Sequence, residues 1–177
     1  MTKRITICRK RDIAAAGQFY DEVTRYLDST INYPKWRQGS YPSESSVSEA
    51  YNKGTQYLCV DNGRITGAFV LNDDPQGDYA SAKWSRRLPE GQYAVLHAFA
   101  VHPDFMHGDT AAFMLQWAKE RAKKSGAKGI RLDVVPTNYP ARRFYEKHGF
   151  AFVEERDLGR SFDDIPTFCL YEYYFDK

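Results

Sequence analysis

The sequence predicts a mixed α/β fold in which about four helices flank one central sheet of parallel and antiparallel strands. Three observations predict it. Strand-like and helix-like patterns follow one another in the order strand, helix, helix, three strands, helix, strand, helix, strand, strand. Residues 93–101 form a near-continuous apolar run, which is typical of a strand covered on both faces. Residues 110–125 carry apolar side chains on one helical stripe and charged side chains on the other.

The N-terminal part is predicted to begin with a strand and two helices. Residues 5–7 alternate apolar and polar side chains, as a strand does, and Asp12 can cap the helix that follows. Residues 45–52 fit a second, short helix. Residues 56–71 read as two strands joined at Asn62-Gly63, because Asn-Gly between two apolar runs is a strong hairpin signal.

After the amphipathic helix, the pattern returns to strands. We expect strands at residues 130–135, 150–155 and 167–175 and a short helix at residues 140–148. The last strand is rich in aromatic side chains and has two interpretations. It is either an edge that pairs with a second copy in a homodimer or an internal strand of the sheet.

Two segments lack a regular pattern. Residues 29–43 are rich in aromatic side chains and turn formers, which indicates a packed loop. Residues 72–91 are polar and turn-rich, which indicates a long surface excursion, and long ordered loops are often functional. The acidic residues of this second loop can attract a cationic amine or simply be solvated.

Composition limits the kinds of partner. The chain has 177 residues, 42% of them hydrophobic, so we expect one folded domain over residues 1–177. Its net charge of +2 gives no strongly basic field that would favour nucleic acid or an anionic membrane. Without a signal-peptide pattern or a membrane-length apolar run, we expect a cytoplasmic protein. The three cysteines lack metal-ligand spacing, so we expect buried thiols and no metal site.

The most informative stretch runs from residue 93 to residue 155. A buried strand is followed by a turn at residues 105–109 and then by the amphipathic helix. The first turn of a helix presents unpaired backbone N–H groups and the positive end of the helix dipole, which favour an anion such as a pyrophosphate.

These residues resemble a known family. The strand Leu96-His97-Ala98-Phe99-Ala100-Val101-His102-Pro103, the turn and helix after it, and the block Asn138-Tyr139-Pro140-Ala141-Arg142-Arg143-Phe144-Tyr145-Glu146-Lys147-His148-Gly149-Phe150 are similar to the acetyl-CoA core of GNAT acetyltransferases. The second block is the more specific match. The order of the flanking elements extends the resemblance over nearly the whole chain, with the cofactor core at about residues 93–155.

The resemblance implies a GNAT fold with a V-shaped split between the strands at residues 93–101 and 130–135, where acetyl-CoA binds. Main-chain groups of the first strand pair with the cofactor, loop amides hold its pyrophosphate, and the second block contacts it again near the sulfur. The implied cofactor-binding residues are Phe99, Ala100, Val101, Met106, His107, Gly108, Asp109, Thr110, Ala111, Asn138, Ala141 and Tyr145.

The activity implied is transfer of the acetyl group to a primary amine of a small molecule, peptide or protein. Such a reaction needs a base for the amine, donors for the developing oxyanion and a proton for the leaving thiolate. Tyr145 can donate that proton, and the N–H of Phe99 or Ala100 is the oxyanion donor by family analogy. His97 shares a strand face with Phe99 if the alternation is regular, and can act as the base directly or through water.

Several of these residues also have plain structural interpretations. Tyr145 can be a packed aromatic residue on a helix that faces the sheet, and His97 a hydrogen-bonded core side chain. Tyr33 and Trp36 can line the acceptor pocket, because their loop corresponds to the part of the family that varies with substrate, or can simply pack under the loop.

The sequence departs from the family in the phosphate turn. Met106 stands where Gln or Arg is usual, and Asp109 stands where Gly is usual. A carboxylate at a helix start repels phosphate, whereas Gly108 can shift the turn and His102 and His107 can supply compensating charge. We therefore expect cofactor binding to survive at reduced affinity. The alternative hypothesis is a non-catalytic CoA-binding or regulatory module with a decayed phosphate loop.

Overall fold

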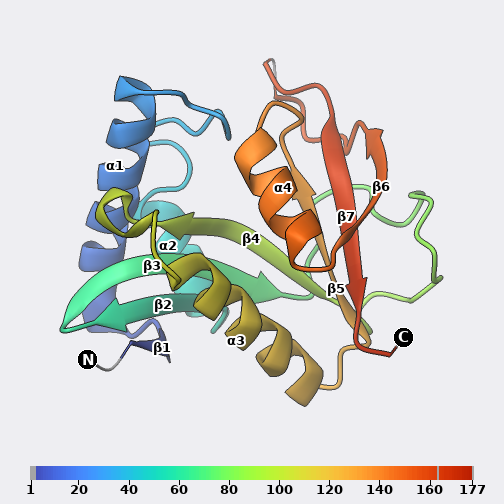
Figure 1. Cartoon of the computed structure of the whole chain (residues 1–177), viewed down its shortest axis with the longest axis horizontal. Coiled ribbons are helices and arrows are strands. Elements are labelled where there is room, and N and C mark those ends of the chain that lie inside the picture. The colour runs from blue at the N-terminus through green and yellow to red at the C-terminus, as the bar shows by residue number, and fades with distance from the viewer. Residues whose placement is uncertain (1–2, 163, 177) are drawn as a thin grey trace. The chain divides into compact units, whose positions relative to one another are not determined.

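Seven strands form one mixed sheet in the part of the chain that the computed structural model describes, residues 3–162 and 164–176. Their order across the sheet is β1-β2-β3-β4-β5-β7-β6, and four α-helices accompany them (Figure 1). The elements are β1 Arg4–Ile7, α1 Ile13–Ser29, α2 Glu44–Asn52, β2 Gln56–Asp61, β3 Arg64–Asn72, β4 Ala94–Val101, α3 Thr110–Lys124, β5 Gly129–Val134, α4 Tyr139–Lys147, β6 Ala151–Arg156 and β7 Phe168–Tyr174. Every predicted strand and helix is present in the predicted order.

Two compact units make up the chain. The first unit comprises Met1–Asn32, Trp36–Leu71 and His97–Glu120, and the second comprises Tyr33–Lys35, Asn72–Leu96 and Arg121–Lys177. The strand β4 contributes residues to both units. The expectation of a single domain stays a prediction.

The first unit is built on the antiparallel strands β1, β2 and β3. Asn62 and Gly63 both have positive φ angles, 49° and 81°, which is the requirement of the tight turn predicted for this hairpin. In β1, Ile5 lies opposite Cys59 of β2. The edge strand β1 is therefore fixed by its register to the hairpin.

Helices cover both faces of these strands (Figure 1). The helices α1 and α2 pack on one face, where their buried side chains form a core with alternate residues of the sheet. On the other face, Met114 and Trp117 of α3 lie over Gly67 and over the rings of Tyr57 and Phe69. The core against α1 and α2 consists of Cys8, Ala16, Phe19, Tyr20, Val23, Val47, Leu58, Ala68 and Ala100.

The second unit contains β5, β7 and β6 in that order, and β7 is antiparallel to both of its neighbours. The aromatic strand β7 is thus internal, and its interpretation as a pairing edge was wrong. The Tyr171 hydroxyl accepts a hydrogen bond from Arg142 of α4, and the ring of Tyr173 lies against that of Phe150, which follows the helix. Buried residues of the opposite face pack under the loop segments at 79–88 and 158–165.

A buried arginine attaches the long polar loop to β5. Arg131 is almost fully buried, and its guanidinium carbon lies 4.2 Å from the centroid of Trp84 and 4.1 Å from that of Tyr93. It donates to the Arg86 carbonyl at 2.7 Å and to the Tyr174 hydroxyl at 3.2 Å. Stacking between two rings lets a weakly hydrated guanidinium be buried, so this residue is an anchor of the loop.

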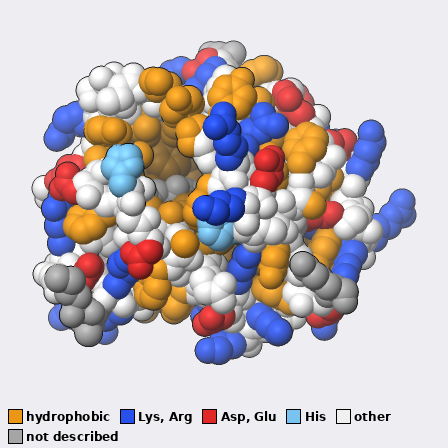
Figure 2. Space-filling view, in the orientation of Figure 1, with side chains coloured by type: hydrophobic (Ala, Val, Ile, Leu, Met, Phe, Trp, Pro, Cys, Tyr) orange, Lys and Arg blue, Asp and Glu red, His pale blue; other side chains and the backbone are white. Residues whose placement is uncertain are grey.

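The positions of the cysteines and of the charged side chains agree with what the composition predicts. Cys8, Cys59 and Cys169 are buried free thiols, as predicted. Acidic and basic side chains are interspersed over the face seen in Figure 2, in keeping with the net charge of +2. Within residues 3–162 and 164–176, none of the helices is both long and apolar enough to cross a membrane.

Candidate functional site

The strand β4 is irregular in its middle. Ala98 has a φ of +46°, the left-handed conformation that residues other than glycine rarely adopt in a strand. The buried hydroxyl of Tyr20 on α1 donates to the Ala98 carbonyl at 2.7 Å. Because one residue turns out of the extended conformation here, the regular alternation assumed for His97 and Phe99 does not hold across Ala98.

The side chains after this irregularity pack on opposite faces. Ala98 and Ala100 contact the core under α1, whereas the ring of Phe99 lies 5.9 Å from that of Phe69. The side chains of these residues thus pack against other side chains. The family resemblance assigns the contact with a ligand to the main chain of this segment.

The pairing between β4 and β5 is short. Its register consists of Ala94 opposite Ile130 and Val95 opposite Arg131, all four within the second unit, whereas β5 and β7 pair along six residues each. The rest of β4 belongs to the first unit. The V-shaped opening beyond these pairs stays a prediction.

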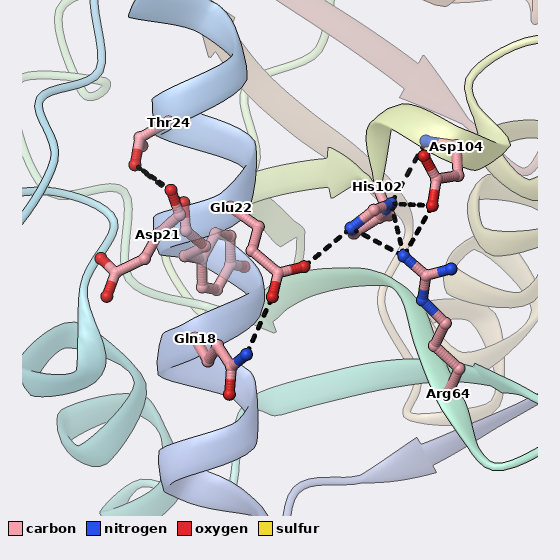
Figure 3. A network of polar contacts seen from close by, with 8 residues as sticks. Gln18, Asp21, Glu22, Thr24, Arg64, His102 and Asp104 are labelled. Atoms are coloured by element: carbon pink, nitrogen blue, oxygen red, sulfur yellow. Dashed lines mark hydrogen bonds and ion pairs between the residues drawn. The ribbon is translucent and has the colours of Figure 1, made fainter.

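A polar network fixes the turn that follows β4 (Figure 3). His102 is buried, and its Nε2 lies 2.9 Å from the Glu22 carboxylate. Its Nδ1 accepts a hydrogen bond from the Asp104 backbone N–H at 3.2 Å. Since Nδ1 accepts, we assign the ring proton to Nε2, which donates to Glu22. Arg64 of β3 donates to the Asp104 carboxylate at 2.7 Å.

This network favours the ionised form of Glu22. Hydrogen bonds from His102 and then from Gln18 hold the pKa of the Glu22 carboxyl below its ordinary value. In the structure, His102 is thus engaged with α1 and with the turn itself. Its role toward the Asp109 carboxylate stays a prediction.

Asp109 directly precedes α3, and its carbonyl accepts the Phe113 N–H at 2.9 Å, the first bond of the helix. Its carboxylate forms an ion pair with Lys3, which stands just before β1. This ion pair lowers the pKa of the Asp109 carboxyl. The cation that compensates Asp109 is Lys3, a residue that sequence reasoning missed because the fold brings it from the other end of the unit.

The main chain of the turn is open. A Cβ placed on Gly108 would meet only the Phe105 carbonyl, at 3.6 Å, and Met106 and His107 are exposed. Thr110, by contrast, is buried. The predicted phosphate turn therefore has accessible backbone at its tip and a compensated carboxylate beside it.

In the second unit, the matching block forms α4 and its cap. The side-chain oxygen of Asn138 accepts the Ala141 N–H at 3.3 Å, which is an ordinary helix cap. Tyr145 is buried, and its ring packs against Phe144 and Phe150. Burial, followed by the charge of Asp133, raises the pKa of the Tyr145 phenol, so the side chain stays protonated.

Asp133 of β5 links two loop segments of the second unit. It accepts from the Tyr79 hydroxyl at 2.6 Å and from two guanidinium nitrogens of Arg160 at 2.7 Å each. Arg160 also donates to the carbonyls of Pro75 and Gln76. The buried carboxylate thereby holds both the 72–91 loop and the segment before β7.

The two predicted acceptor-site residues fall in different units. Trp36 belongs to the first unit, where its ring lies 6.3 Å from that of Tyr20 and 6.5 Å from that of Tyr41. Tyr33 belongs to the second unit, and its carbonyl accepts from the Thr137 hydroxyl at 3.2 Å. These are packing and loop contacts, and the role of both residues toward an acceptor stays a prediction.

The acidic residues of the long loop line an open hollow of about 600 Å³ in the second unit. Asp74 accepts the Gln76 N–H at 3.0 Å, and its own N–H donates to Asn72 at 3.1 Å. These local bonds explain acidic residues at this turn without a ligand. The lining consists of Asp73, Asp74, Pro75, Gln76, Gly77, Glu90 and Gly91.

Comparison with known proteins decides the family. The sequence pattern of the Acetyltransferase (GNAT) family matches residues 20–150, which is most of the chain. The chain belongs to the GNAT family. The match includes the irregular β4, the turn before α3 and the block that forms α4.

One relative in sequence is described as an N-acetyltransferase. An uncharacterised N-acetyltransferase of Methanocaldococcus jannaschii is 29% identical over 102 residues, which is 58% of this chain and 40% of the relative. The matched part of this chain therefore spans only two fifths of that relative's length.

Solved structures show the GNAT fold. A GNAT acetyltransferase of Listeria monocytogenes is similar with a TM-score of 0.76 at 16% identity, with 97% of this chain and 94% of that chain covered. A Salmonella typhimurium protein described as an acetyltransferase, determined with acetyl-CoA, is similar with a TM-score of 0.70 at 17% identity, with 100% and 96% covered. At such identities the likeness concerns the fold, and it matches the mixed sheet of seven strands with four helices described above.

Proposed function

We propose that this chain is an acetyltransferase that moves the acetyl group of acetyl-CoA to a primary amine of a small molecule, peptide or protein. Family membership supports the reaction type. The observation that carries the proposal is the connection from β4 to α3, where an open glycine turn with a compensated carboxylate precedes a helix of 15 residues. This is the arrangement that an anionic cofactor needs.

The residues of this connection fit the cofactor. The first-turn N–H groups of α3 and the backbone at Gly108 can hold a pyrophosphate, and no Cβ at Gly108 obstructs it. The main chain of Phe99, Ala100 and Val101 is the proposed partner of the pantetheine arm. In the second unit, Asn138 and Ala141 at the start of α4 are the further proposed contacts.

Acetyl-CoA, when bound, supplies an acyl thioester that an amine can attack. The chain's own groups then have three tasks. The N–H of Phe99 or Ala100 stabilises negative charge on the carbonyl oxygen. His97, half-buried on β4, accepts the proton of the amine directly or through water. Tyr145, kept protonated by burial, donates a proton to the departing thiolate.

Turnover and binding measured on one variant test this proposal. Tyr145→Phe removes the phenolic proton and keeps the ring, so release of the CoA thiol should fall about tenfold or more. The affinity for acetyl-CoA, measured by calorimetry, should change little. Equal turnover in the two forms would remove Tyr145 from the mechanism.

The second candidate function is a non-catalytic CoA-binding module, favoured by Met106 and Asp109 in the phosphate turn. It predicts acetyl-CoA binding without thiol release for small amines, polyamines and peptide N-termini alike. The pairing of Asp109 with Lys3 weakens this candidate, because the charge that motivated it is neutralised.

A further inference from the structure

We propose that Lys3 is the cation of the phosphate turn and that it neutralises Asp109 so that a pyrophosphate can bind at the start of α3. The inference rests on the proposed function, and it adds a binding determinant outside residues 20–150, the range that matches the family pattern. Lys3 lies 106 positions before Asp109 in the chain and forms an ion pair with its carboxylate.

The turn needs such a cation. An anion at a helix start gains from the N–H groups and the helix dipole, but a neighbouring carboxylate opposes it. The position that carries Gln or Arg in the resembling family is Met106 here, so the turn itself brings no long donor at that place. A cation from another element can supply the positive charge.

Lys3 is held where this charge is required. Its side chain is only 19% exposed, whereas that of Asp109 is 82% exposed. Its ammonium also lies 5.7 Å from the ring centroid of Phe113, in the first turn of α3. The next residue, Arg4, pairs with Val60 in the β1–β2 ladder. The lysine therefore stands next to a paired strand, and its ammonium lies near Phe113 in the first turn of α3.

The other carboxylate between β4 and α3 is also paired with a cation. Asp104 receives a hydrogen bond from Arg64 of β3 at 2.7 Å. Both acids between β4 and α3 thus have a cation that comes from the N-terminal strands or from the residue just before them. The connection presents balanced charge to an incoming phosphate, although it contains two carboxylates.

Acetyl-CoA affinity in a double-mutant cycle tests this inference. Lys3→Met leaves an uncompensated carboxylate beside the pyrophosphate and should raise the dissociation constant about tenfold. Asp109→Asn in the Lys3→Met background should return it to within about threefold of the unsubstituted chain. Lys3→Arg should keep the affinity. The effect of Lys3→Met should shrink as salt is raised, because the Asp109 carboxylate is exposed.

A matched control removes a lysine charge at the far end of α3 from Asp109. Lys124, the last residue of that helix, is exposed, and about 20 Å of helix separate it from Asp109. Lys124→Met should leave acetyl-CoA affinity unchanged. Thermal unfolding of every variant shows whether a loss of binding comes from loss of the fold.

The outcomes separate the two proposals. Unchanged affinity in Lys3→Met, with acetyl-CoA bound by the unsubstituted chain, would overturn the inference and leave the proposed function standing. Weak binding by Lys3→Met that Asp109→Asn fails to rescue would overturn neutralisation in favour of direct phosphate contact. An unsubstituted chain that does not bind acetyl-CoA would overturn both proposals.

Discussion

At the scale of single residues, the candidate site depends on main-chain geometry held by buried side chains. Ala98 adopts a left-handed conformation in β4, and the hydroxyl of Tyr20 bonds to its carbonyl. Alanine carries no sequence signal for this conformation, unlike glycine, so the irregularity could not be predicted. The tyrosine on α1 thereby positions the backbone that the proposed mechanism uses.

Tyr20→Phe should separate positioning from packing. The ring and its contacts remain, but the Ala98 carbonyl loses its donor, so the free energy of unfolding should fall by about 1 kcal/mol in urea denaturation. Turnover should fall several-fold with little change in the KM for acetyl-CoA. Tyr26→Phe, on the exposed side of the same helix, is the control and should change neither quantity.

The protonation state of Tyr145 gives a second prediction. Burial raises the pKa of this phenol above its ordinary value of 10.0, so it keeps its proton throughout the range in which an amine acceptor becomes deprotonated. The kcat should therefore show no alkaline decline between pH 8 and about pH 10. A decline with an apparent pKa well below 10 would contradict the role of Tyr145 as a protonated donor.

At the scale of the elements, residue patterns predicted each strand and helix but not which other elements it packs against. All strands and helices were predicted because hydrophobic periodicity and turn residues are local signals. Whether β7 was an edge or an internal strand was not decided, since sheet order depends on contacts that a strand's own sequence does not contain. The packing of α3 against β3 was likewise not predictable from the sequence of α3, because it depends on Gly67 of β3.

Gly67→Ala should destabilise the first unit. A Cβ at this position would collide with the sulfur of Met114 and approach the Ala100 carbonyl to 3.0 Å. We expect a loss of about 1–3 kcal/mol in the free energy of unfolding. Gly108→Ala is the matched control, because its Cβ would meet only the Phe105 carbonyl at 3.6 Å, and its stability should be unchanged.

The link between α1 and the turn after β4 has a pH signature. The pKa of the Glu22 carboxyl is lowered by its hydrogen bond with His102, so the bond stabilises the fold at neutral pH and is lost as pH falls below the ordinary value of 4.5. Between pH 7 and pH 3, the melting temperature should drop further in the unsubstituted chain than in Glu22→Gln. Parallel curves for the two proteins would show that this pair does not contribute.

At the scale of the whole molecule, the site could be predicted only where neighbouring residues carry it. The strand, turn and helix at 93–125 and the block from Asn138 to Phe150 are contiguous, so their sequence alone carries the resemblance to the family. Lys3 and Asp109, or Asp133 and Arg160, are far apart in sequence and meet only in the fold. Charge compensation of this kind gives no local signal.

The central claim, that this chain binds acetyl-CoA for acyl transfer, is tested most directly by titrating the purified protein with acetyl-CoA in a calorimeter. The account predicts saturable binding of one molecule per chain, with a dissociation constant on the order of micromolar to tens of micromolar. No heat of binding at millimolar acetyl-CoA would contradict it.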